Sequence, residues 1–126
     1  MLQTFIFPGD VPTKKNKYVI GENRLGGKML YKPKTVTSFE KLVAQVIMVQ
    51  RGKRIEGPMK MSLTLVHSAK AEPDLDGTIT TVLDAMQDAG LFDNDKEIKQ
   101  ILACEKRQTT GPKDLPRVEV TIGKIK

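Results

Sequence analysis

The chain has 126 residues, of which 39% are hydrophobic and 29% charged, with ten glycines and seven prolines. This composition excludes a disordered or collagen-like chain, and the length fits one domain that buries about two thirds of its unfolded surface. One cysteine and one histidine exclude an internal disulfide and Cys- or His-rich metal sites, so any metal must be held by oxygen. Without a signal peptide pattern or a membrane span, we expect a cytoplasmic protein with no small-molecule cofactor.

The charges are distributed unevenly along the chain. The formal net charge is +6, yet residues 72–97 hold eight acidic residues against one lysine. A basic protein body favours a polyanionic partner such as nucleic acid. An acidic patch within that body is typical of enzymes that place a divalent cation between carboxylates and phosphate. Charge alone is equally compatible with a basic protein whose acids are merely solvated.

The first half of the chain predicts a strand, a hairpin and a helix. The apolar run 2–7 is a strand candidate, and residues 18–20 and 29–31 flank a glycine-rich turn as the arms of a hairpin. The segment Thr37–Glu40 has the spacing of a capping box, so a helix is expected to begin there and to stop at Gly52.

The second half of the chain predicts three strands and a second helix. Apolar and polar residues alternate over 59–67, as on a strand buried on one face, and an apolar stripe over 77–89 predicts a helix capped by Gly90. The remaining segments are an acidic loop, a strand, a turn and a last strand, at 91–96, 98–104, 111–116 and 118–122. The sequence therefore predicts a single α/β (α+β) domain over residues 1–126, with two main helices on a mixed β-sheet.

Three aspartates of the acidic segment are candidate metal ligands. Asp74 and Asp76 are two residues apart in a stretch expected to be extended, where residues i and i+2 point to one side. Asp95 is a third candidate on the loop after the helix. Magnesium takes octahedral oxygen ligands and keeps several waters, so two or three carboxylates suffice. The alternative is structural, with Asp76 as the N-cap of the helix and 93–95 as an ordinary turn.

Several short motifs follow one another along the chain. They are Pro12–Asn16, a helix introduced by Ser38, Asp74-Leu75-Asp76, Leu83-Asp84-Ala85, Ala89-Gly90-Leu91, Asp95 three residues before Ile98, and Lys106 at the close of the next strand. In this order, over about residues 5–122, the chain resembles the RusA family, the small phage and prophage Holliday-junction resolvases.

The resemblance implies a homodimeric, Mg²⁺-dependent endodeoxyribonuclease, encoded by a bacterial host or a phage, that resolves four-way DNA junctions by symmetric nicking. Mn²⁺ can substitute for Mg²⁺ in such a site. The three catalytic and metal-binding aspartates of the family fall on Asp74, Asp76 and Asp95. The implied chemistry is hydrolysis of a phosphodiester by metal-activated water.

Two positions depart from the family pattern. Gly77 stands where an asparagine is usual, and Thr80 stands where a lysine is expected one helical turn later. Because threonine cannot supply a positive charge to the phosphate, activity is expected to be reduced or lost unless another cation replaces the lysine. Lys70 and Lys96 are the candidates for that replacement.

A lysine-rich loop near the N-terminus is the candidate DNA-binding segment. Lysines on a loop can follow a phosphate backbone without reading bases. The residues are Lys14, Lys15, Asn16 and Lys17. A solvated surface loop is the alternative. His67 is expected to be a hydrogen-bonded packing residue and Cys104 a core residue.

The length of the second predicted helix limits how Asp95 can reach Asp74. The helix 77–89 is about 20 Å long, and the residues from Gly90 to Asp95 span that distance only when fully extended. If two copies of the helix pack antiparallel across a two-fold axis, Asp95 of one chain comes beside Asp74 and Asp76 of the other. We therefore hypothesise composite sites in a homodimer.

Three functional hypotheses remain at this level. The first is the metal-dependent junction endonuclease. The second is a non-catalytic module of the same fold that binds branched DNA, a hypothesis favoured by Thr80 in place of the lysine. The third is a small basic protein that assembles on RNA or on another protein, with acids that only cap a helix.

Overall fold

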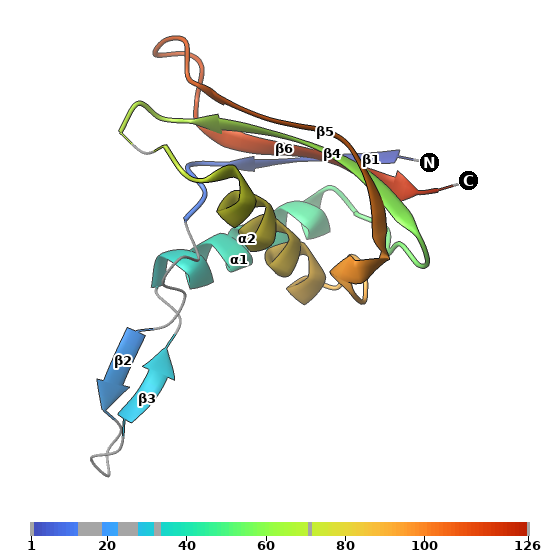
Figure 1. Cartoon of the computed structure of the whole chain (residues 1–126), viewed down its shortest axis with the longest axis horizontal. Helices are drawn as coiled ribbons and strands as arrows, with labels where there is room; N and C mark the ends of the chain where they lie inside the picture. The colour runs from blue at the N-terminus through green and yellow to red at the C-terminus, as the bar shows by residue number, and fades with distance from the viewer. Residues whose placement is uncertain (1, 13–18, 23–27, 32–33, 71, 126) are drawn as a thin grey trace.

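Four strands form the main sheet, and two helices cover one of its faces (Figure 1). The computed structural model describes residues 2–12, 19–22, 28–31, 34–70 and 72–125. The predicted α+β arrangement is confirmed. The elements are β1 (Leu2–Pro8), β2 (Val19–Glu22), β3 (Lys28–Tyr31), α1 (Lys34–Val49), β4 (Met59–His67), α2 (Leu75–Asp88), the 3₁₀ turn η1 (Asp95–Glu97), β5 (Ile98–Gln108) and β6 (Arg117–Lys124).

The strand order of the main sheet is β1-β6-β4-β5. β6 is antiparallel to both β1 and β4, whereas β4 and β5 run parallel. β4 is an interior strand, paired with β6 and β5, and its alternating pattern buries Met59, Met61, Leu63 and Leu65 in the core. Parallel neighbours cannot be joined by a hairpin, so the chain crosses from β4 to β5 through α2 and η1. The predicted hairpin is also present, with β2 and β3 antiparallel in a sheet of their own.

The first helix begins three residues earlier than the capping-box spacing predicts. α1 starts at Lys34, so Thr37 lies within the helix and is not its N-cap. The reason is that Val36 is fully buried on the same stripe as Phe39 and Val43, which extends the helical pattern toward the N-terminus.

The second helix begins two residues earlier than predicted and ends one residue earlier. α2 spans Leu75–Asp88, which places Asp76 inside the first turn. Gly90 has a φ of +85°, so its predicted role after the helix end is confirmed. The acidic loop that follows opens with Leu91 and Phe92, which are both buried in the core.

β5 is four residues longer than predicted and forms one edge of the sheet. The prediction stopped at Cys104 because the apolar pattern ends there, but the charged residues 105–108 continue to pair with β4. The pairing register shifts twice, so that Lys99 and Leu102 have no partner on β4. Ile101 and Leu102 are 49% and 60% exposed in the middle of this strand.

In the part of the chain that the structure describes, no helix combines the length and the apolar character needed to cross a bilayer.

A charge cluster fixes the turn between β5 and β6. The Asp114 carboxylate accepts hydrogen bonds from Arg107 Nη1 at 2.6 Å, from Arg117 Nη1 at 2.9 Å and from the backbone amide of Thr110 at 2.9 Å. The two guanidinium groups, with the Thr110 amide, hold the pKa of Asp114 well below its usual range. The ionised form of Asp114 therefore contributes to folding stability at neutral pH.

We expect the Asp114→Asn variant to be less stable than the wild type at pH 7, by an amount that shrinks on acidification. A carboxyl group whose pKa is lowered by folding gives stability that is complete above its unfolded pKa, about 4, and is lost as the pH falls toward the folded value. Urea denaturation at pH 7 and in steps below pH 4 measures the difference. A gap of constant size at every pH would contradict this role of the charge.

Candidate functional site

The first two candidate ligands lie at the N-terminal end of α2. Asp74 is the N-cap residue, with extended backbone, and Asp76 is the second residue of the helix; both are exposed. The prediction that both sit on extended chain is therefore wrong for Asp76, because the helix starts at Leu75. Both carboxylates still lie at the positive end of the helix dipole, which favours negative charge.

The alternative prediction, in which Asp76 is the N-cap of the second helix, is also wrong. The N-cap position belongs to Asp74 and not to Asp76, and the Asp74 side chain makes no capping hydrogen bond with α2. Its backbone carbonyl accepts hydrogen bonds from the amide and the hydroxyl of Thr78, both at 3.0 Å. Asp76 Oδ1 accepts from the amide of Gly77 at 2.8 Å.

The third candidate ligand lies at the opposite end of α2. Asp95 opens η1, and its backbone amide donates to Oε1 of Gln87, in the last turn of α2, at 3.1 Å. A helix of 14 residues is about 20 Å long, so Asp95, bonded at the end of α2, is separated from Asp74 by the length of that helix. Among the described residues, no three His, Cys, Asp or Glu side chains gather closely enough to hold a metal ion.

The loop that carries Asp95 is attached to the segment between α1 and β4. The amide of Ile55 donates to the carbonyl oxygen of Leu91 at 2.8 Å. Arg54 forms an ion pair with Asp93 and also reaches the carbonyl oxygen of Gly90 at 3.3 Å. Hydrogen bonding to Asp93 raises the pKa of Arg54. These contacts hold the Asp95 loop against the 51–57 segment and away from the start of α2.

Comparison with known protein families gives a match over most of the chain. Residues 8–123 match the model of the family described as endodeoxyribonuclease RusA, a range that includes both ends of α2 and all of β4 and β5. The chain belongs to the RusA family. No curated protein matches the chain. Membership identifies an endodeoxyribonuclease of the Holliday-junction resolvase type, which acts on branched DNA, and enzymes of this type generally depend on a divalent metal.

The position at which the RusA resemblance expects a lysine holds an exposed threonine. Thr80 lies one turn after Asp76, and its hydroxyl donates to the carbonyl oxygen of Asp76 at 3.0 Å. Of the two predicted substitutes, Lys96 lies in η1 beside Asp95, at the far end of α2. Lys70 is exposed in the turn after β4.

Lys106, which is among the residues that carry the resemblance, is a further cation near the start of α2. Lys106 Nζ donates to the carbonyl oxygen of Pro73 at 3.3 Å and lies 3.9 Å from Oε2 of Glu72. Its ammonium group is therefore held beside the residue that precedes Asp74. The parallel pairing of β5 with β4 produces this contact, because the end of β5 returns to the end of β4 where α2 begins.

The predicted lysine-rich DNA-binding segment, Lys14, Lys15, Asn16 and Lys17, lies outside the described residues. His67 is buried and its Nδ1 lies 3.0 Å from the carbonyl oxygen of Ser68, which confirms its structural role. Cys104 is partly buried against the core, as predicted, and desolvation raises the pKa of its thiol. A raised thiol pKa argues against a nucleophilic cysteine.

Proposed function

We propose that this RusA-family protein is a homodimeric, Mg²⁺-dependent nuclease that resolves four-way DNA junctions by symmetric nicking. Its sites would combine Asp74 and Asp76 of one chain with Asp95 of the other. The observation that supports this arrangement is the placement of the three aspartates at opposite ends of a rigid helix. A four-way junction has two-fold symmetry, as a dimer with two equivalent sites would have.

The donor set at the start of α2 fits a hard divalent cation. Asp74 and Asp76 are exposed carboxylates two residues apart, and oxygen ligands of this kind are those that Mg²⁺ prefers. Mn²⁺ accepts the same ligands. A bound divalent ion would lower the pKa of a water molecule and neutralise charge on the scissile phosphate. Two side chains leave coordination positions for water, phosphate and a third carboxylate.

The positive charge that the chain itself supplies to this site would come from Lys106. Its ammonium group lies beside Pro73, so it can bind a phosphate oxygen next to Asp74 without a conformational change in the backbone. The first turn of α2 adds the positive end of its dipole. These groups would orient the phosphodiester and stabilise the negative charge that builds up on it.

The course of β5 supports the proposed exchange of Asp95 between two chains. This strand runs from η1, where Asp95 lies, to Lys106, which contacts the residue before Asp74. A two-fold axis near the middle of β5 would therefore exchange the two ends and carry Asp95 toward the other chain's Asp74. The exposed side chains of Ile101 and Leu102 lie at that point and provide apolar surface for the contact.

A second candidate function is a module of the same fold that binds branched DNA without cutting it. Thr80 favours this alternative, because it stands where the family pattern has a lysine and supplies no positive charge to the phosphate. Its hydroxyl donates a hydrogen bond to the backbone of α2 instead.

Nicking of a labelled four-way junction tests the proposal. We expect paired nicks with Mg²⁺ or Mn²⁺, none with EDTA and none in a linear duplex of matched sequence. Asp74→Asn is expected to lower the rate by at least about 100-fold, because a metal-binding carboxylate is lost. Glu119→Gln is the control, since Glu119 lies on β6 and pairs with Arg117. Tight binding without cleavage in the wild type would establish the non-catalytic alternative.

Mixing two inactive variants distinguishes composite sites from sites within one chain. In a mixed dimer of Asp76→Asn and Asp95→Asn, one composite site keeps all three aspartates and the other loses two. Random pairing should therefore restore about a quarter of the wild-type rate of single nicks, since half of the dimers are mixed and each has one complete site. A mixture no more active than its parents would rule out shared sites.

Lys106→Gln should lower the nicking rate by about 100-fold while junction binding changes much less, because the ammonium group acts mainly on charge that develops during the reaction. Adding Thr80→Lys in that background should recover part of the rate. Lys99→Gln, on the same strand, is the matched control. Unchanged nicking by the Lys106→Gln variant would remove this lysine from the mechanism.

A further inference from the structure

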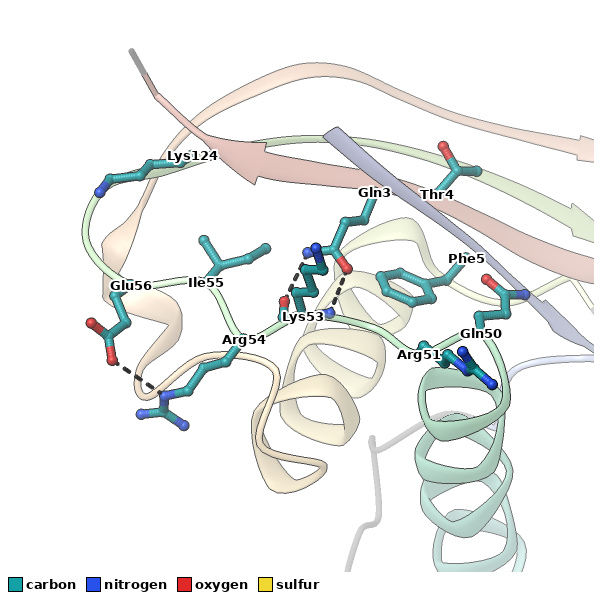
Figure 2. A pocket seen from close by; sticks show the side chains of 10 residues that line it. All are labelled: Gln3, Thr4, Phe5, Gln50, Arg51, Lys53, Arg54, Ile55, Glu56 and Lys124. Carbon is teal, nitrogen blue, oxygen red and sulfur yellow. Dashed lines mark hydrogen bonds and ion pairs between the residues drawn. The ribbon is translucent and has the colours of Figure 1, made fainter. Parts of the chain in front are cut away.

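A hollow of about 610 Å³ lies between the end of α1, the start of β1 and the end of β6 (Figure 2). We call it the basic hollow. It is lined by four cations and one acid, with glutamines beside them. The charged lining residues are Arg51, Lys53, Arg54, Glu56 and Lys124.

Among the described residues, three of the four cations in the basic hollow have no ion pair, so they can bind an anion. Arg54 is neutralised locally, since it pairs with Glu56 at 3.7 Å and with Asp93. Arg51, Lys53 and Lys124 are exposed, and no carboxylate of the described residues forms an ion pair with them. The hollow therefore presents a net positive surface.

The backbone that carries two of these cations is fixed to the core. The Gln3 side chain makes two hydrogen bonds of 2.8 Å with Lys53, donating to its carbonyl oxygen and accepting from its amide. A Cβ at Gly52 would lie 2.8 Å from Ile47 Cγ2 and 3.0 Å from Phe5 Cζ, so this segment packs closely on buried side chains. The cations on either side of Gly52 are thus presented from an ordered surface.

Arg51 occupies a backbone position that normally belongs to glycine. The amide of Arg51 donates to Met48 O at 3.0 Å and the amide of Gly52 to Ile47 O at 2.8 Å, which is the Schellman pattern at a helix end. Arg51 has a φ of +54°, in the left-handed region that disfavours side chains. An arginine here costs stability relative to glycine, which makes its side chain a candidate for a functional role.

We propose that the basic hollow binds the DNA backbone of a junction arm through Arg51, Lys53 and Lys124, as a phosphate-contact surface separate from the carboxylate site. The proposal rests on the junction-binding function proposed above. The cations are spread over a loop and the end of β6, an arrangement that suits successive phosphates of a strand better than one small anion. Phosphate contacts of this kind set register and orientation and carry no sequence information.

The position of the basic hollow relates it to cleavage. Its loop is bonded to the Asp95 loop through Ile55 and Leu91, at 2.8 Å. DNA held in the hollow is thereby placed at the end of α2 that contributes Asp95. In a composite site, this is the end that approaches the other chain's Asp74.

The salt dependence of junction binding tests the proposal. The triple variant Arg51→Gly, Lys53→Gln, Lys124→Gln removes three charges, and glycine at position 51 relieves the left-handed backbone. Binding of a fluorescent four-way junction is measured in EDTA over a series of NaCl concentrations. Each lost phosphate contact should reduce the magnitude of the slope of log K against log [salt] by about 1, so we expect a reduction of about 3.

A charge-matched control separates local contacts from the effect of net charge. Lys41→Gln, Lys60→Gln, Lys113→Gln removes the same charge from α1, β4 and the β5–β6 turn. Equal slopes for the two triple variants, or a wild type that binds no DNA, would overturn the proposal. If junction binding depends on the basic hollow but Asp74→Asn nicks like the wild type, the carboxylate mechanism fails while the phosphate surface stands.

Discussion

The parallel pairing of β4 and β5 is the constraint on which the arrangement of the site depends. Parallel strands require a crossover, and here the crossover contains α2 and η1. The crossover helix begins where β4 ends and finishes where β5 begins, so residues on either side of it are kept apart by its length. Asp76 and Asp95 are such residues. The same pairing brings Lys106, at the far end of β5, back to the start of α2.

The regular elements were predictable because their burial is periodic. β4 alternates and α2 carries a helical stripe, and both predictions are confirmed apart from the ends of the helix. The errors arise where packing overrides local signals. Val36 extends α1 beyond the apparent capping box, and the charged end of β5 has no apolar alternation because the edge of the sheet is exposed. Edge strands gain their stability from backbone pairing, which leaves a weak pattern in the sequence.

The candidate site was predictable in its residue types but not in its distances. The spacing of Asp74 and Asp76 indicated a pair of ligands, and the length of the following helix already indicated that Asp95 lies far away. Lys106 belonged to the motifs of the resemblance, but its position beside Pro73 could not be predicted, because that contact depends on which strands pair and in which direction. The distance between two residues along the sequence does not tell which strands pair or whether they run parallel.

The two register shifts in β5 have a consequence for how copies of the chain can meet. An unpaired sheet edge is a template for open-ended strand addition, the route to fibrous aggregates. In β5 the extra residues Lys99 and Leu102 interrupt a regular ladder, and charged side chains occupy the second half of the strand. Edge-to-edge growth is thereby disfavoured, while the exposed faces of Ile101 and Leu102 stay accessible. In the proposed dimer, contact through these side chains would form a closed pair, so assembly would end at two copies.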